Sequence, residues 1–155
     1  IETTSTKIKD KQFSIKHQNK DWGIKNWLNL IEKLKKDHLV ILSVHNETEI
    51  IDGVYAPKNV NFRLACSILY QSDIYIGPEG GFGHVAAAFR KKAVIYFGGW
   101  IDPQITGYDF HENIYFENQS SPCGEYKNLC NHCSEARKKI TVDYYFQRID
   151  KILSR

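Results

Sequence analysis

The chain has 155 residues, of which 42% are hydrophobic, and its 21 basic and 18 acidic residues leave a net charge of +3. That length supports one hydrophobic core and is short for two ordinary domains, and the interspersed charges are typical of a solvated surface rather than of nucleic-acid binding. No apolar run approaches the roughly 20 residues that cross a bilayer, so we expect a soluble cytoplasmic protein with at most peripheral membrane association. The sequence contains no methionine, and we expect it to be a fragment of a longer protein or a processed product.

The first third of the chain predicts the start of an alternation of strands and helices. Residues 1–11 are polar and aperiodic, so we expect a linker or the tail of a preceding element, followed by a single domain over residues 12–155. Gln12–His17 has the character of a strand, and apolar residues then recur at helical spacing over Ile24–Leu34. Leu39–Val44 is a continuous apolar run, which is typical of a strand buried on both faces.

The rest of the chain continues this alternation. Val60–Phe62 is a short possible strand, and Asn61 is a candidate N-cap for a helix that extends through Leu69. The later expected elements are, in order, the strand Ile74–Ile76, the helix His84–Phe89, the strand Ala93–Phe97, a loop over residues 98–112, the strand Asn113–Glu117 and a closing helix over Val142–Leu153. The pattern predicts an α/β fold: a Rossmann-like parallel sheet with helices on both faces and ligand sites at the carboxyl ends of the strands.

The most informative segment is residues 74–89, where an apolar strand enters a glycine cluster that opens a helix. Gly80 and Gly81 let the backbone approach a ligand closely, and the free N–H groups at a helix start favour phosphate. His84 lies in the first turn, near enough to donate a hydrogen bond to a diphosphate. The alternative is a tight strand-to-helix turn with glycines needed only for packing, and with His84 satisfied by a backbone carbonyl. The segment is not a P-loop, because no Gly-Lys-Ser/Thr follows the glycines. It is not the dinucleotide fingerprint either, because its glycines have the wrong spacing.

Further candidate ligand groups follow the other expected strands. Lys20 can reach a phosphate, and Glu47 or Glu49 can accept hydrogen bonds from ribose hydroxyls, although each is also read as an ordinary surface charge. Trp22 and the loop at residues 98–100 belong to the same set. Because the carboxyl ends of parallel strands share one edge of a sheet, we expect these groups to meet there.

The order of these motifs resembles the carboxyl-terminal half of glycosyltransferase family 9, over roughly residues 12–153. The motifs that carry the resemblance are Lys20-Asp-Trp22, Asn26 to Leu34, the Gly-x-x-His core at Gly81 to His84, and Val94 to Gly98. This family includes the heptosyltransferases of lipopolysaccharide biosynthesis. Its members consist of two Rossmann-like halves in the GT-B arrangement, and the second half binds the nucleotide-sugar donor.

The resemblance implies the donor-binding domain of an inverting glycosyltransferase, with an ADP-heptose-like donor and a lipopolysaccharide, lipid-linked or other glycan acceptor. Carried over by position, the donor-binding residues are Lys20 at the phosphate, Glu49 at the ribose, and Glu79, Gly80, Gly81 and His84 at the sugar diphosphate. The chain departs from the family at Glu79-Gly80-Gly81, where Asp-Ser/Thr-Gly is usual, and this changes the contacts to the sugar. The family's catalytic base belongs to the amino-terminal half, so we assign no catalytic residue and expect this chain alone to be inactive, with that half as a partner and no cofactor.

Two other functions remain open. A non-catalytic module that binds a nucleotide or phosphosugar is the main alternative. Half of a sugar-nucleotide epimerase of related architecture is a weaker one.

A cysteine segment near the carboxyl end supplies three thiols and an imidazole within eleven positions: Cys123, Cys130, His132 and Cys133. This ligand set can bind a metal, but the Cys130-x-x-Cys133 pair lacks a second such pair at zinc-finger distance, so we predict no metal. Reduced thiols, or a disulfide from Cys123 to Cys130 or Cys133, are favoured instead. The cysteine spacing does not resemble a small secreted scaffold, which favours a reducing compartment.

Overall fold

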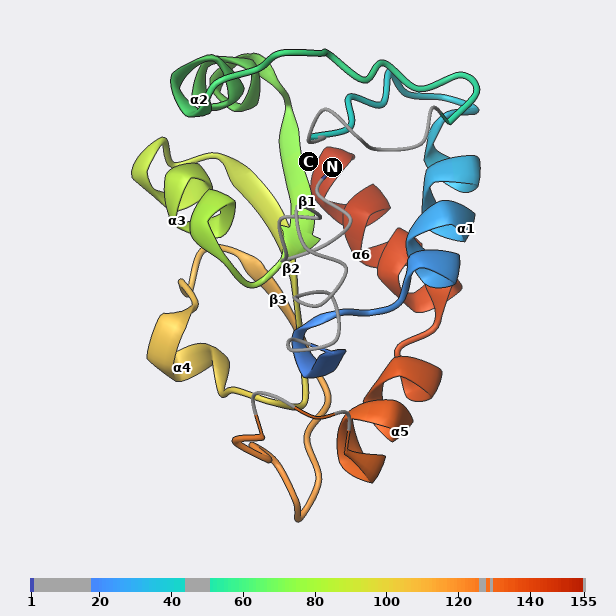
Figure 1. Cartoon of the computed structure of the whole chain (residues 1–155), viewed down its shortest axis with the longest axis vertical. Coiled ribbons are helices and arrows are strands. Elements are labelled where there is room, and N and C mark those ends of the chain that lie inside the picture. The colour runs from blue at the N-terminus through green and yellow to red at the C-terminus, as the bar shows by residue number, and fades with distance from the viewer. Residues whose placement is uncertain (2–17, 44–50, 126–127, 129, 155) are drawn as a thin grey trace.

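The computed structural model describes residues 1, 18–43, 51–125, 128 and 130–154. Its centre is a parallel three-stranded sheet of β1 (Ile74–Pro78), β2 (Lys92–Gly98) and β3 (Glu112–Tyr115), in the order β1-β2-β3 (Figure 1). The predicted strand Gln12–His17 lies outside the described residues, as does the end of the predicted strand Leu39–Val44. Within its described part, that second strand forms one isolated parallel bridge, between Ile41 and Tyr55.

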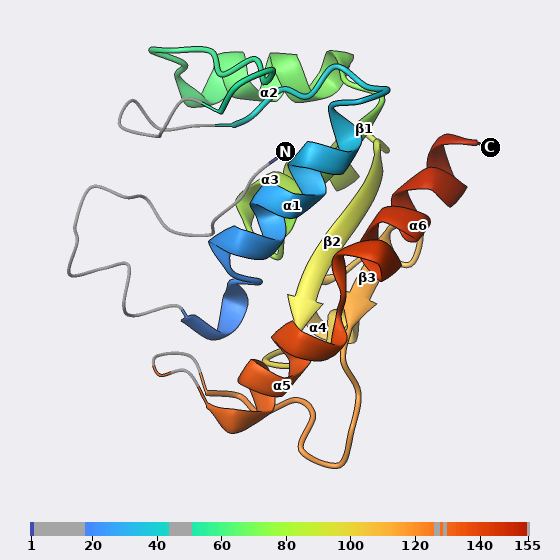
Figure 2. The same ribbon diagram turned by 90° about the vertical axis from the view of Figure 1, so that its right-hand side faces the viewer.

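Helices cover both faces of the sheet, as the alternation predicted. They are η1 (Gln18–Lys20), α1 (Ile24–Leu34), α2 (Phe62–Gln71), α3 (Gly81–Ala88), α4 (Pro103–Thr106), α5 (Asn131–Lys139) and α6 (Val142–Leu153). Helices α1 and α6 pack together on one face, and α3 packs on the other. Figure 2 shows α6 running alongside β2 and β3. No helix in the described ranges is long and apolar enough to cross a membrane.

The core has two parts because side chains along a strand alternate between the faces of a sheet. Ile76, Val94 and Tyr96 point to the α1 and α6 side, whereas Tyr75, Ile95 and Phe97 point to the α3 side. Trp22, Trp27 and Tyr145 complete an aromatic cluster on the first side, with ring centroids of Trp22 and Trp27 5.0 Å apart. On the second side, Ala86 and Gly83 let α3 approach the sheet closely.

Trp22 corrects one sequence-based expectation. It was expected among the ligand groups at the edge of the sheet, but its side chain is fully buried and its indole N–H donates to the Ile140 carbonyl at 2.9 Å. Packing of this large ring against Trp27 and Tyr145 stabilises the fold more than an exposed position at the edge of the sheet would.

The sequence-predicted boundaries are correct in some places and wrong in others. Asn61 is confirmed as an N-cap, since its side chain accepts from the Leu64 N–H at 2.9 Å. The prediction of a short strand at Val60–Phe62 is wrong, because the Asn61 cap starts α2 at Phe62. Helix α3 begins at Gly81, three residues before the expected start.

Helices α4 and α5 were not predicted. Asp102 caps α4 and Pro103 occupies its first turn, which is a recognisable start signal inside the expected loop.

Candidate functional site

The start of α3 is an open, glycine-lined helix terminus. Gly80 is its N-cap and has no side chain to cap it, and a Cβ placed on Gly80 or Gly81 would meet no atom within 4 Å. The N–H groups of Gly83 and His84 both point to the Gly80 carbonyl, at 3.0 and 3.4 Å. Within the described ranges, no acceptor meets the N–H groups of Gly81 and Phe82. Unpaired donors at the positive end of a helix dipole favour an anion.

A lysine and a glutamate stand directly beside this terminus. Lys20 Nζ lies 2.7 Å from Glu79 Oε2, and the two side chains are only 16% and 9% exposed. Lys20 Nζ also lies 4.9 Å from the centre of the Trp100 ring. The N–H of Glu79 donates to the Tyr96 carbonyl at 2.9 Å, which fixes the end of β1 against β2. The ion pair thus joins η1 to the turn that opens α3.

His84 projects from the first turn of α3 towards the loop before β3. Its Nδ1 lies 3.1 Å from the Tyr108 hydroxyl, and the two rings meet edge to face at 5.8 Å. Beneath them is a cavity of about 10 Å³, roughly the size of one water, lined partly by polar atoms of Thr106, His111 and Asn113. Burial lowers the pKa of His111 below its usual value of 6.5.

Asn19 ties Lys20 to the cysteine segment. Its side chain is 1% exposed, and its amide nitrogen donates to the carbonyls of Glu125 and Asn128. Its side-chain oxygen accepts from the Cys130 N–H at 3.2 Å. Each polar atom of this buried amide is therefore paired, and η1 is anchored to the segment that carries the thiols.

A second connection links the same segment to the loop after β2. The N–H of Cys123 donates to the Gly99 carbonyl, and the N–H of Gly124 donates to the Trp100 carbonyl, both at 3.0 Å. The backbone of the cysteine segment thus supports the tryptophan against which the Lys20 ammonium lies.

The thiols of Cys123, Cys130 and Cys133 form a compact cluster in which every pair of sulfur atoms lies within 4.8 Å. The Cys123 Sγ atom is 3.4 Å from Cys133 Sγ and 3.7 Å from Cys130 Sγ. All three thiols are free, and so is Cys66, which lies apart on α2. The alternative of a disulfide from Cys123 is therefore not formed in this structure.

The three thiols differ in acidity. Burial raises the pKa of Cys123 and raises that of Cys133 strongly. Burial also acts to raise the pKa of Cys130, but hydrogen bonds from the Cys133 N–H and the neighbouring thiols outweigh it and lower the pKa. Cys130 is therefore the first of the cluster to become a thiolate.

His132 does not join the thiol cluster. Its Nε2 lies 3.1 Å from the Gly99 carbonyl and 3.1 Å from Ser121 Oγ, so the ring is directed to the loop after β2. A Cβ on Gly99 would lie 2.4 Å from that nitrogen. Glycine at this position permits the close approach of the imidazole.

Five of the six predicted donor-binding residues gather around the start of α3: Lys20, Glu79, Gly80, Gly81 and His84. The sixth, Glu49, lies outside the described residues, as does Glu47. Sequence reasoning missed Asn19, whose partners are 106 to 111 positions away in the chain. It also missed Tyr108. The aromatic-rich composition of the loop at residues 98–112 was the only indication of this residue in the sequence.

These features define a class of fold. A parallel sheet with helices on both faces and an open glycine turn at the carboxyl end of β1 is a Rossmann-like domain, and this turn lies at the edge of the sheet where such domains bind their ligands. The fold class predicted from the sequence is confirmed. No protein-family model and no curated protein sequence matches the chain.

The fold is similar to that of several solved glycosyltransferase and heptosyltransferase structures. The chain is similar to the iron-containing dodecameric glycosyltransferase TibC from enterotoxigenic E. coli H10407, with a TM-score of 0.74 and 17% identity over 99% of this chain and 45% of that one. It is also similar to the E. coli heptosyltransferase WaaC with ADP, with a TM-score of 0.66 and 16% identity over 97% of this chain and 43% of that one. The chain thus spans less than half the length of these proteins.

Proposed function

We propose that this chain is the donor-binding domain of an inverting GT-B glycosyltransferase that uses an ADP-heptose-like nucleotide sugar. The observation that carries the proposal is the open amino terminus of α3 beside Lys20, since together they offer N–H donors and a cation to one anion. TibC has been solved in complex with ADP-D-β-D-heptose, and WaaC with ADP and with ADP-2-deoxy-2-fluoro heptose. These proteins have the same fold, which supports the assignment of this ligand class.

In this proposal the leaving diphosphate lies over Gly80 and Gly81. The unpaired N–H groups of Gly81 and Phe82 donate to phosphate oxygens, and Lys20 adds a charge-assisted hydrogen bond. The absence of side chains at both glycines leaves room for the phosphates. These groups stabilise the negative charge that grows on the diphosphate as the sugar departs, which is how a transferase without a covalent intermediate gains most of its rate.

Glu79 and His84 bracket this diphosphate position. Glu79 fixes the Lys20 ammonium at 2.7 Å, and its second oxygen is a candidate acceptor for a sugar hydroxyl. Tyr108, whose hydroxyl lies 3.1 Å from Nδ1, orients the His84 ring and leaves Nε2 as the candidate donor to the ligand. The base that deprotonates the acceptor hydroxyl is assigned to the amino-terminal half of the longer protein.

Calorimetric titration of the chain with ADP, ADP-heptose, UDP-glucose and GDP-mannose tests the proposal directly. We expect ADP and ADP-heptose to bind and to raise the melting temperature, because a ligand at 100 times its Kd stabilises the folded form by about 2.7 kcal/mol. No binding by any of the four nucleotides refutes it. Binding without transfer, even after the chain is joined to an amino-terminal half, favours the non-catalytic module. Turnover of the sugar nucleotide without an acceptor favours the epimerase.

A second proposal concerns the thiol cluster, which we infer to be a structural metal site held by Cys123, Cys130 and Cys133. A tetrahedral ion about 2.3 Å from each thiolate holds its sulfurs about 3.8 Å apart, close to the 3.4 and 3.7 Å found here. Thiolates suit zinc and iron–sulfur centres rather than hard ions such as magnesium or calcium, and TibC is described as iron-containing. The ion would make the cysteine segment rigid, and with it the Asn19 anchor next to Lys20.

Metal analysis of the purified chain tests this site, with Cys66 as the matched control because it lies outside the cluster. We expect about one iron or zinc ion per chain, less than a tenth of that in Cys123→Ser, and no change in Cys66→Ser. A chelator should lower the melting temperature of the parent chain and not that of Cys123→Ser. Equal metal content in the two serine variants contradicts the assignment.

A further inference from the structure

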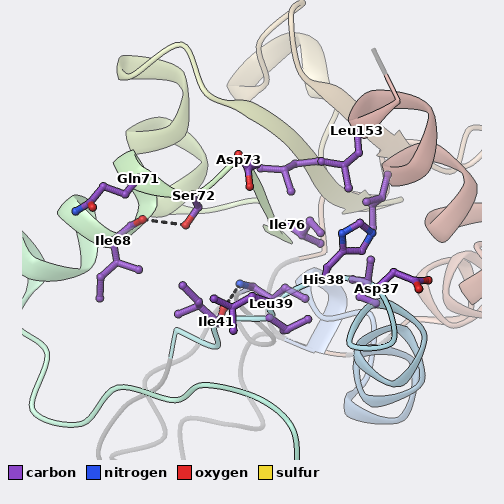
Figure 3. A pocket seen from close by; sticks show the side chains of 15 residues that line it. Asp37, His38, Leu39, Ile41, Ile68, Gln71, Ser72, Asp73, Ile76 and Leu153 are labelled. Carbon is purple, nitrogen blue, oxygen red and sulfur yellow. Dashed lines mark hydrogen bonds between the residues drawn. The ribbon is translucent and has the colours of Figure 1, made fainter.

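A small polar cavity lies beneath His84 and Tyr108, between α3 and the loop that leads from α4 to β3. Its volume is about 10 Å³, which is the space that one water molecule needs. Figure 3 shows another cavity, of about 470 Å³, which lies near the start of β1, and no described residue lines both. Gly80 and Gly83 line the small cavity, so it lies directly under the candidate donor site.

Three buried polar atoms belong to side chains that line this small cavity. They are Thr106 Oγ1, His111 Nε2 and Asn113 Oδ1, and none has a hydrogen-bond partner within the described ranges. The His111 residue is only 7% exposed, so bulk solvent does not serve its ring. Folded proteins rarely leave such groups unpaired, because an unpaired buried polar atom destabilises the fold. Three of them around one cavity point to a ligand that completes their bonds.

The protons of these three groups determine the chemistry of that ligand. The Asn113 amide nitrogen donates to the Tyr108 carbonyl at 3.1 Å, so the remaining amide atom is the oxygen, which is an acceptor. The His111 ring donates to the Lys91 carbonyl, and burial lowers its pKa, so the neutral ring offers Nε2 as a second acceptor. The Thr106 hydroxyl can donate or accept. Two acceptors cannot bond to each other, so the cavity requires a small molecule with two protons to donate.

Water meets this requirement. It donates one proton to His111 and one to Asn113, and its oxygen accepts from the Thr106 hydroxyl. Buried waters typically make about three hydrogen bonds to groups that are otherwise unpaired. A metal cation would find three neutral ligands and no carboxylate or thiolate among them, so the chemistry favours water.

We propose that one buried water binds Thr106, His111 and Asn113 in this cavity and thereby positions Tyr108 beside His84. Thr106 and Asn113 lie on either side of Tyr108 in the chain, and the water joins them across the loop. The Tyr108 carbonyl accepts from the His111 N–H at 3.0 Å and from the Asn113 amide at 3.1 Å. The water fixes the other polar atoms of the same two side chains, while the Tyr108 hydroxyl lies 3.1 Å from His84 Nδ1. The water site stands by itself, whereas its effect on the donor rests on the proposed function.

Thr106→Val tests the water site through the sign of its effect on stability. Valine keeps the branched shape of threonine but lacks the hydroxyl. Removal of an unpaired buried hydroxyl raises the melting temperature, whereas removal of one that bonds to a water lowers it. We expect a decrease of about 2–5 °C. A high-resolution crystal structure of the parent chain should show a solvent oxygen within about 3.2 Å of all three polar atoms.

Hydrogen exchange and ADP binding test the positioning role. Exchange of the His111 N–H should become about threefold faster or more in Thr106→Val, because its bond to the Tyr108 carbonyl loses support. The matched control Thr106→Ser keeps the hydroxyl and should change this exchange by less than about twofold. Thr106→Val should weaken ADP binding about two- to tenfold. It should weaken binding no further when added to Tyr108→Phe, because the water acts through that hydroxyl.

An equal or higher melting temperature of Thr106→Val overturns the water site, and so does a crystal structure without a solvent oxygen within reach of all three atoms. Unchanged exchange at His111, or additive losses of ADP affinity in the double variant with Tyr108→Phe, overturns the positioning role. A parent chain that does not bind ADP refutes the proposed function instead. Melting, diffraction and exchange need no donor, so they still decide whether the water is bound and supports the loop.

Discussion

Replacement of Lys20 by alanine separates the part of this residue in donor binding from its part in stability. The ion pair with Glu79 spans 2.7 Å, and both side chains are largely shielded from water, at 16% and 9% exposed. Loss of the ammonium leaves the Glu79 carboxylate without its cation, which costs about 1–3 kcal/mol of folding free energy. Loss of a charge-assisted hydrogen bond to phosphate weakens ADP binding by about 1.5–3 kcal/mol, or roughly 10- to 150-fold.

The double variant Lys20→Ala with Glu79→Gln makes these two effects distinguishable. The neutral amide at position 79 no longer needs a cation, so we expect most of the stability to return while ADP affinity stays low. Lys33→Ala is the matched control, because Lys33 is also paired with a carboxylate, Asp143 at 2.6 Å, but on the exposed side of α1 and α6. It should change neither quantity by more than about 1 kcal/mol.

Urea unfolding and calorimetric titration with ADP measure the two free energies. ADP is preferred to ADP-heptose here because contacts from position 79 to the sugar then cannot contribute. The reasoning fails if Lys20→Ala binds ADP as tightly as the parent chain. It also fails if the double variant regains affinity, since the loss would then come from repulsion by an unpaired Glu79 and not from a missing contact.

Four further single substitutions test the site and its surroundings. His84→Ala should weaken ADP binding by about 1–3 kcal/mol, and Tyr108→Phe by about 0.5–1.5 kcal/mol, because the hydroxyl only orients the ring; equal affinities by calorimetry would falsify this arrangement. Gly99→Ala should destabilise the fold by about 1–3 kcal/mol through its contact with His132, and the melting curve should recover when His132→Ala is added. The pKa of His111 is lowered by burial, so the unfolded chain takes up a proton first as the pH falls through 6.5. Stability is therefore complete above this pH and declines below it towards the lowered pKa, and His111→Gln should reduce the decline between pH 7.5 and 5.5 in urea titrations.

The amino-acid sequence alone was sufficient for the fold class and for the place of the open glycine turn along the chain. Continuous apolar runs predicted the strands of the sheet, and apolar residues at helical spacing predicted the helices that cover it. Both patterns reflect which side chains are buried. The glycine cluster after Ile74–Ile76 predicted an open helix start, because only glycine leaves the backbone free of side chains there. Asn61 as a cap is equally local, since its side chain bonds to an N–H three residues away.

Tertiary structure decided what depends on residues far apart in the chain. Trp22 lies two residues after η1, yet it is buried, because α1 and α6 pack over it. Asn19 contacts a segment more than 100 positions away, and no local pattern encodes such a contact. The lack of a second pair like Cys130-x-x-Cys133 at zinc-finger distance predicted no metal site, whereas the fold brings Cys123 Sγ to 3.4 Å from Cys133 Sγ. The periodic pattern of apolar residues indicates which side chains are buried, and burial is a property of single residues. Which distant residues come into contact depends on the path of the whole backbone.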